Sequence, residues 1–93
     1  MGVTERRRYT RTTVTWPVRL WVDGASVDGT AHDVSPRGIC IATAPTAAVK
    51  VGVSYRIDVL AGRGAWKSVV ADARHHELDR GRIGFEITSP WLT

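Results

Sequence analysis

Cysteine is almost absent from this sequence of 93 residues, in which Cys40 is the only one. A single cysteine excludes an intramolecular disulfide and a zinc site built from several cysteines. Because the neighbours Ile39 and Ile41 are apolar, we expect Cys40 to be a small buried or half-buried residue and not a reactive thiol.

Long apolar runs are also missing. The N-terminus is charged, but no apolar run of about 7–15 residues follows it, as one would in a secretory signal. Nowhere do about 18 apolar residues run together, as a membrane-spanning helix requires. The sequence therefore predicts a cytoplasmic protein that does not insert into a membrane.

The motifs of common enzyme classes are lacking as well. There is no Gly-x-Ser-x-Gly and no glycine-rich phosphate loop ending in Lys-Ser or Lys-Thr. The adjacent His75 and His76 would point to opposite sides of a strand, so they do not suit one metal ion. Ion pairs across strands explain Glu77, Asp79 and Glu86 more simply than catalysis does. We therefore expect no enzyme, no metal site and no cofactor.

Positive charge is concentrated near the N-terminus. The net charge is +4, and three of the 13 basic residues form the run Arg6–Arg8. Residues 1–12 are polar and cationic and lack apolar periodicity, which is typical of a flexible arm. We expect residues 13–93 to form one small domain with a single core.

A period of two, typical of half-buried strands, begins at Val14. The first strand is predicted over 14–22, where Pro17 indicates a sheet edge or a bulge because proline donates no ladder hydrogen bond. The pairs Asp23-Gly24 and Asp28-Gly29 predict turns. Further strands are predicted over 29–34, 39–43, 54–60, 65–74 and 82–87.

Six short strands with mostly short connections predict an all-β fold, a small antiparallel barrel or sandwich. The connection 44–52 has room for one helical turn at most, and residues 88–91 suit a short C-terminal helical turn or a packed tail. The alternation turns Trp21 outward, whereas we expect Trp16 and Trp66 to pack in the core or at its rim.

A polar stretch, Asp33–Gly38, interrupts this pattern. If Val34 points into the core, Asp33 and Ser35 both point outward on one side. Pro36 stiffens the turn, and Gly38 stands where a left-handed or closely approached backbone would be needed. On this stretch alone, a plain polar turn and a binding site are equally open.

Two arginines of the arm favour the binding site. Arg7 and Arg11 are four residues apart, so on a turn or helical coil their side chains can hold one anion or one planar base together. The O6 and N7 acceptors of guanine match a guanidinium, as phosphates do. An outward Asp33 would accept hydrogen bonds from the N1–H and N2–H₂ groups of guanine. The combination indicates a guanine-nucleotide clamp.

These segments resemble the signature of the PilZ domain family, Arg-x-x-x-Arg followed further along the chain by Asp/Asn-x-Ser-x-x-Gly. The sequence has both, as Arg7–Arg11 and Asp33–Gly38, and Gly81–Phe85 also looks like the family's last strand. The resemblance covers nearly the whole chain. It implies a six-stranded antiparallel β-barrel that binds the bacterial second messenger cyclic di-GMP.

The resemblance also implies a role for each motif residue. The two motif arginines would hold guanine edges and phosphates, Asp33 and Ser35 would contact the other guanine or its ribose-phosphate, and Gly38 would permit close approach. In this family, a cationic residue at the position of Arg6 tends to accompany a stacked ligand dimer. The predicted ligand-binding residues are Arg6, Arg7, Arg11, Asp33, Ser35 and Gly38.

The sequence shows no output domain, so we expect a stand-alone receptor. Ligand binding would order the arm, and the signal would pass by contact with another protein. As an alternative, some PilZ-like barrels serve only as protein-interaction modules, and four tryptophans support this hypothesis. A barrel for single-stranded nucleic acid needs outward aromatics along a groove, and the inward phase of most aromatics argues against a nucleic-acid polymer as partner.

Overall fold

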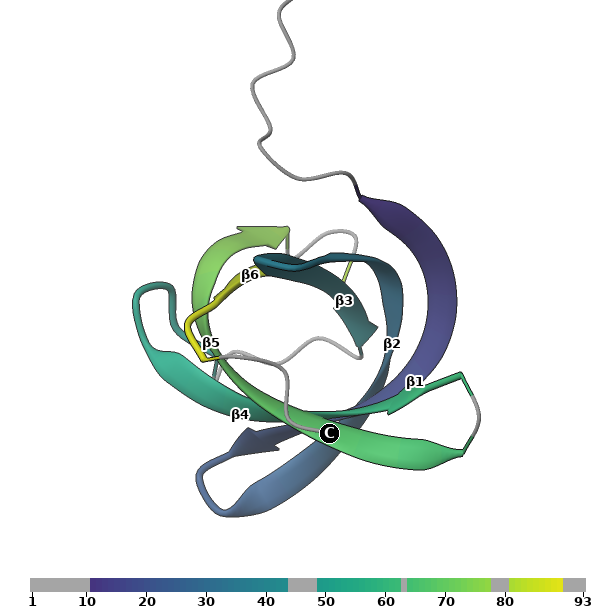
Figure 1. Ribbon diagram of the computed structural model, residues 1–93. Coiled ribbons are helices and arrows are strands. Elements are labelled where there is room, and N and C mark those ends of the chain that lie inside the picture. Colours follow the sequence, from purple (N-terminus) through teal and green to yellow (C-terminus); the bar gives the residue numbers. More distant parts are fainter. Residues whose placement is uncertain (1–10, 44–48, 63, 78–80, 90–93) are drawn as a thin grey trace, which may run out of the picture.

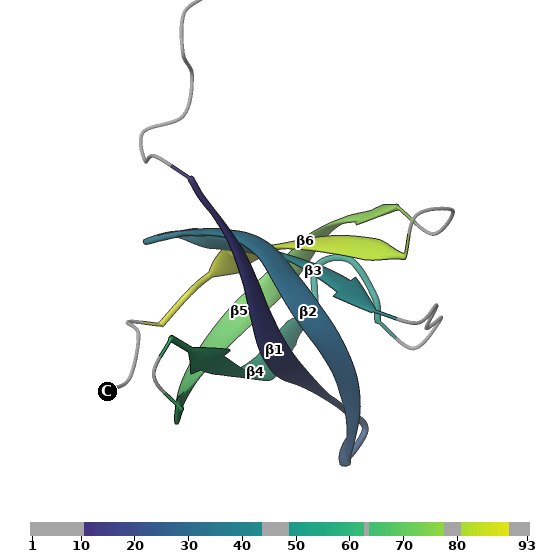
Figure 2. The ribbon, with the colours of Figure 1, turned by 90° about the vertical axis from the view of Figure 1, so that its right-hand side faces the viewer.

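The chain forms a closed barrel of six strands (Figures 1 and 2). The computed structural model describes residues 11–43, 49–62, 64–77 and 81–89. Neighbouring strands are antiparallel and follow the order β1-β2-β3-β6-β5-β4 around the ring, which confirms the predicted all-β barrel. The strands are β1 (Thr12–Val22), β2 (Ala25–Ser35), β3 (Gly38–Thr43), β4 (Ser54–Ala61), β5 (Ala65–Glu77) and β6 (Arg82–Ile87).

Branched aliphatic side chains fill the barrel. Alternate residues of every strand point inward, as the period of two predicts, and each of the larger ones stabilises the fold by about 1.5–3 kcal/mol through burial. This core makes the barrel wall a firm support for whatever the outer faces carry. The largest fully buried side chains are Leu20, Ile41, Ile57, Ile83, Val18, Val59 and Val69.

One of the two predicted aspartate-glycine turns is present. Asp23 and Gly24 connect β1 to β2 with φ angles of 52° and 82°, the left-handed backbone that tight hairpins require at both central positions. Asp28 and Gly29 instead lie inside β2, which begins at Ala25, so the prediction of a turn there is wrong.

Gly29 has a packing role in place of a turn role. A Cβ atom at this position would lie 2.7 Å from the carbonyl oxygen of Ala42 on β3. Glycine therefore permits the close approach of β2 and β3. This contact between strands, and not a turn, explains the glycine of the Asp28-Gly29 pair.

Pro17 lies where β1 has a single neighbour. β1 pairs with β2 over most of its length, but with β4 only over Val18–Trp21, and its register with β2 shifts between Thr13 and Trp16. The missing N–H of Pro17 therefore interrupts no bond to β4. β1 is not an edge strand of the closed barrel, and its register shift precedes Pro17. What holds of the expectation is local, since no residue of β4 pairs with β1 at Pro17.

Two further expectations need correction. β5 extends to Glu77, three residues beyond the predicted end at position 74, and so includes both histidines. Trp66 is 42% exposed. The odd-numbered Val69 and Ala71 of β5 point into the barrel, so the even-numbered Trp66 lies on the outer face. The core or rim position predicted for Trp66 is therefore wrong.

Some predicted features fall outside the described residues. The possible helical turn after Ala44 and the C-terminal one at 88–91 lie largely in the ranges 44–48 and 90–93, which the structure does not describe. Within the described ranges, no helix is long and apolar enough to cross a membrane.

Candidate functional site

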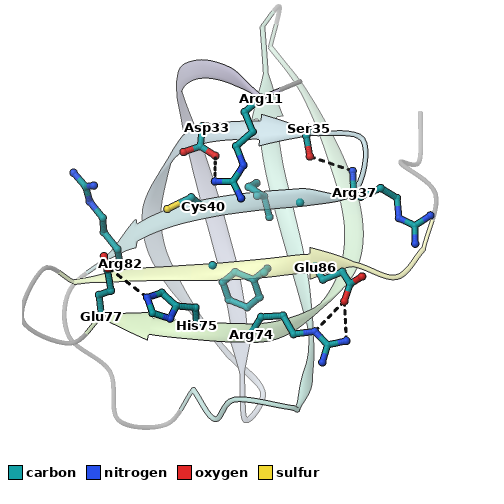
Figure 3. A pocket seen from close by; sticks show the side chains of 14 residues that line it. Arg11, Asp33, Ser35, Arg37, Cys40, Arg74, His75, Glu77, Arg82 and Glu86 are labelled. Atoms are coloured by element: carbon teal, nitrogen blue, oxygen red, sulfur yellow. Dashed lines mark hydrogen bonds and ion pairs between the residues drawn. The ribbon is translucent and has the colours of Figure 1, made fainter. Parts of the chain in front are cut away.

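An open cavity lies against the outer face of β2, β3, β6 and β5 (Figure 3). Its volume of about 710 Å³ falls within the range of about 300–1,000 Å³ that is usual for small-molecule sites. Four predicted ligand residues, Arg11, Asp33, Ser35 and Gly38, line it, whereas Arg6 and Arg7 lie outside the described residues. The other lining residues are Arg37, Ile39, Cys40, Arg74, His75, Glu77, Arg82, Gly84, Phe85 and Glu86.

The floor of the cavity is low because small residues meet there. Cys40 on β3 is paired with Asp33 on one side and with Gly84 on the other, and Gly84 is paired with His75 on β5. This row crosses four strands, with Asp33 at one end and His75 at the other. A flat group can lie on Cys40 and Gly84 in the middle of the row, with the polar side chains of Asp33 and His75 at its two ends.

Two β-bulges turn the ends of this row outward. The register of β2 against β3 shifts between Ala31 and Asp33, and that of β5 against β6 shifts between Ala73 and His75. Ala31 is fully buried and Val34 is only 9% exposed, although they are three residues apart, an odd spacing that a regular strand would place on opposite faces. The bulge therefore aims Asp33 at the cavity, a common use of bulges at binding sites.

Asp33 has only a weak ion pair. Nη1 of Arg11 lies 3.4 Å from Oδ1 of Asp33, and the side chains are 48% and 29% exposed. Such an exposed pair contributes at most about 1 kcal/mol. Among the described residues Arg11 is the one side chain bonded to Asp33, so a ligand can replace it at small cost.

The turn beyond Asp33 is anchored to β6. The backbone N–H of Arg37 donates to Ser35 Oγ over 3.3 Å, and the carbonyl of Arg37 accepts from the N–H of Ile87 over 2.9 Å. Arg37 thereby stands at the cavity wall on a fixed backbone. Its side chain follows Pro36 within the motif, yet sequence reasoning gave it no role.

Gly38 borders the cavity, and neither its backbone angle nor the packing of the barrel requires a glycine there. Of the two alternatives expected for this glycine, the left-handed backbone is wrong, because its φ is not among the positive values of the described residues. A Cβ atom there would lie 3.4 Å from the carbonyl oxygen of Phe85 and 3.6 Å from Ser35 Oγ. Any side chain at this position would cover part of the cavity floor, so close approach of a ligand stays a prediction for this glycine.

The wall on β5 and β6 carries paired charges. Arg74 donates to Glu86 from Nε and Nη2 over 2.9 and 2.7 Å, as the predicted cross-strand ion pairing requires, and His75 Nε2 lies 3.3 Å from Glu77. Sequence reasoning considered these residues but missed that they border the same cavity as Asp33. The signal would have been the pairing of β3 with β6, which no local pattern shows.

Cys40 lies half-buried in the floor, as expected. Burial raises the pKa of its thiol, and the negative charge of Asp33 raises this pKa further. The thiol therefore stays protonated at neutral pH and acts as a small neutral contact.

Solved structures of other proteins resemble this chain in fold. The solved structure of the Bacillus subtilis inhibitor of motility, MotI/DgrA, matches with a TM-score of 0.79 and 17% identity, over 94% of this chain and 44% of that one. The PilZ domain of YcgR from Escherichia coli, solved with c-di-GMP, matches with a TM-score of 0.74 and 18% identity, over 91% of this chain and 79% of that one. At such identities the likeness shows the fold.

This chain thus spans less than half the length of MotI/DgrA. The comparison with curated protein sequences found no match. The family model of the PilZ domain matches residues 5–90, nearly the whole chain and both motifs. The chain belongs to the PilZ domain family.

Proposed function

We propose that this chain is a cytoplasmic receptor for cyclic di-GMP that signals through contact with another protein. The observation that carries the proposal is the state of Asp33, a carboxylate turned outward by a bulge, held by one weak ion pair and placed beside a low floor. Membership in the PilZ family and the c-di-GMP complex of the YcgR domain support the choice of ligand.

In the proposed complex, a guanine base lies over the floor formed by Gly38, Cys40 and Gly84. Asp33 accepts hydrogen bonds from the N1–H and N2–H₂ groups of this base, and Ser35 contacts the same nucleotide or its ribose-phosphate. Adenine lacks these two donors at the matching positions, so the carboxylate selects guanine. Arg11 leaves Asp33 and binds a guanine edge or a phosphate.

The charge of the cavity suits a ligand with two phosphates. Four arginines line it against three carboxylates, so cationic groups are in excess. In the proposed complex, Arg6 and Arg7 add their charges from the arm of residues 1–12. Binding then ties this segment to the barrel and changes the surface that a partner protein meets.

Isothermal titration with cyclic di-GMP tests the proposal. We expect saturable binding by the wild type, weak or absent binding of cyclic di-AMP, and strong losses for Arg7→Ala, Arg11→Ala and Asp33→Ala. Lys50→Ala is the matched control, since Lys50 is exposed and lies outside the cavity. An absence of binding at tens of micromolar ligand in low salt would refute the receptor function and leave the interaction module as the better hypothesis.

A further inference from the structure

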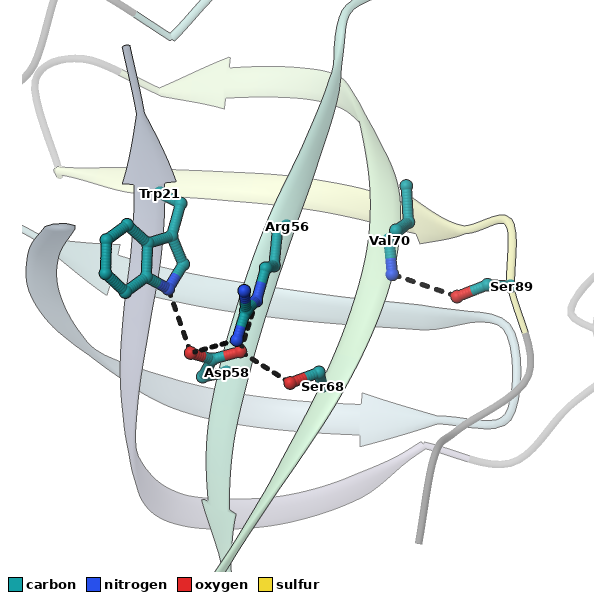
Figure 4. A network of polar contacts seen from close by, with 6 residues as sticks. All are labelled: Trp21, Arg56, Asp58, Ser68, Val70 and Ser89. Atoms are coloured by element: carbon teal, nitrogen blue, oxygen red, sulfur yellow. Dashed lines mark hydrogen bonds and ion pairs between the residues drawn. The ribbon is translucent and has the colours of Figure 1, made fainter. Parts of the chain in front are cut away.

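A second polar cluster lies on the other side of the barrel (Figure 4). In the ring order, β4 is three strands from β3, so the outer face of β1, β4 and the first half of β5 is turned away from the cavity. We call this surface the tryptophan face. Its outward residues are Arg19, Trp21, Arg56, Asp58, Leu60, Trp66, Ser68 and Val70.

The acceptors of this face are already occupied. Asp58 is only 8% exposed, and it accepts from Ser68 Oγ over 2.6 Å and from Trp21 Nε1 over 2.9 Å. Arg56 adds two further bonds to it, from Nε over 3.0 Å and from Nη2 over 3.3 Å. Asp58 and Arg56 therefore neutralise each other, and neither carboxylate oxygen is left without a donor.

Arg19 is the second cation of this face, and it takes no part in the ion pair of Arg56 with Asp58. Its Cζ lies 4.6 Å from the centroid of the Trp66 ring, so the guanidinium is stacked by its face and its N–H edge is left for an acceptor. Asp28 is its paired neighbour on β2 and Asp58 its paired neighbour on β4. The oxygens of Asp58 are already bonded by other side chains, and the side chain of Arg19 extends past it to Trp66 on β5. Among the described residues, no carboxylate forms an ion pair with Arg19.

Two exposed apolar side chains lie on the same face as this free donor, Trp66 against its guanidinium and Val70 four residues further along β5. Trp66 is 42% exposed and Val70 41%, two of the most exposed large hydrophobic side chains among the described residues. The backbone N–H of Val70 is held by Ser89 Oγ over 2.9 Å, so this part of the face is fixed (Figure 4). Tryptophan and arginine in a rigid setting are the residues that most often dominate the affinity of protein interfaces.

We propose that the tryptophan face docks a partner protein through a segment in which a carboxylate stands next to an apolar side chain. The carboxylate binds the N–H edge of Arg19, and the apolar side chain packs on the exposed part of Trp66. A nucleic acid would need several free cations along its backbone, and this face offers one, so a protein segment fits better. The inference rests on the proposed receptor function and adds a partner contact on the side of the barrel away from the ligand cavity, and its test requires no nucleotide.

The test is a selection of random peptides displayed on phage against the full chain, with counter-selection against Arg19→Glu. We expect enriched peptides to carry Asp or Glu beside an apolar residue. A synthetic peptide of this type should lose about tenfold or more in affinity for Arg19→Glu and for Trp66→Ala, as is usual for central interface residues. Lys50→Glu, the charge-matched control, should bind like the wild type.

A charge swap sharpens the result, because a peptide with Lys in place of its acidic residue should prefer Arg19→Glu over the wild type. Thermal unfolding checks that each variant is folded, and Arg19→Gln and Trp66→Phe serve as milder replacements. The proposal fails if no peptide is enriched, if enriched peptides lack acidic residues, or if Arg19→Glu and Lys50→Glu act alike. Co-sedimentation with anionic lipid vesicles that depends on Trp66, without peptide binding, would identify a membrane surface and also overturn it.

Discussion

Asp33 and Asp58 are both aspartates on the outside of the same barrel, but their surroundings differ. Asp58 accepts four hydrogen bonds of 2.6 to 3.3 Å from three side chains and is nearly inaccessible. Asp33 has one contact of 3.4 Å and opens onto a cavity. A carboxylate whose acceptor positions are filled stabilises the fold, whereas one with open positions can bind a ligand. The first prediction therefore concerns the filled site.

Asp58→Ala should lower the free energy of unfolding by about 3 kcal/mol, because it leaves Trp21 Nε1 without its acceptor and removes the links between β1, β4 and β5. Urea unfolding followed by tryptophan fluorescence measures this loss. The affinity for cyclic di-GMP of the folded fraction should stay the same. A stability equal to that of the wild type would contradict the structural role.

Arg11→Ala and Asp33→Ala should show the opposite behaviour. We expect each to weaken cyclic di-GMP binding by about 1.5–3 kcal/mol, the value of a charge-assisted hydrogen bond, while stability changes by about 0.5 kcal/mol or less. Titration calorimetry and urea unfolding on the same samples separate the two effects. If Asp33→Ala instead unfolds the barrel and spares binding, the contrast between the two aspartates is lost.

Two of the strand glycines, Gly29 and Gly38, allow the same contrast. Gly29→Ala should destabilise the barrel by about 2 kcal/mol, because its Cβ would lie 2.7 Å from the Ala42 carbonyl oxygen in the backbone of β3. Gly38→Ala should cost little stability, since its Cβ would meet ordinary contact distances, but should weaken ligand binding by covering the floor. Equal stability of both variants would contradict the assignment.

The smallest expected effect is one of pH. Burial raises the pKa of Asp58, but hydrogen bonds from Ser68, Trp21 and Arg56 and the charge of Arg56 outweigh it, so the pKa of this carboxyl is lowered in the folded state. Its ionised form therefore stabilises the fold above the unfolded pKa of about 3.9, and this contribution is lost as the pH falls through the folded value. Unfolding free energies measured down through this range should fall more steeply for the wild type than for Asp58→Asn.

Much of the fold and part of the candidate site could be predicted locally. The period of two in segments such as 14–22 places strands because side chains alternate along any strand. Asp23 and Gly24 predict their turn because tight hairpins need a left-handed backbone at both positions. The motif at Asp33–Gly38 is contiguous in sequence, so its residue types were visible from the start. The roles of Arg6 and Arg7 stay predictions, because these residues lie outside the described structure.

Only the tertiary structure decided how distant segments share a surface. Strand register is nonlocal, so the sequence did not reveal that Cys40 meets Gly84, or that Arg74 and Glu86 border the cavity of Asp33. The bulge before Asp33 depends on the pairing of β2 with β3, and Gly29 looked like a turn residue because the carbonyl it approaches belongs to another strand. The local sequence pattern determined short strands and a polar motif, because side-chain alternation and turn residues act over a few residues. The pairing of strands decided which polar groups are bonded to each other and which are open to a ligand.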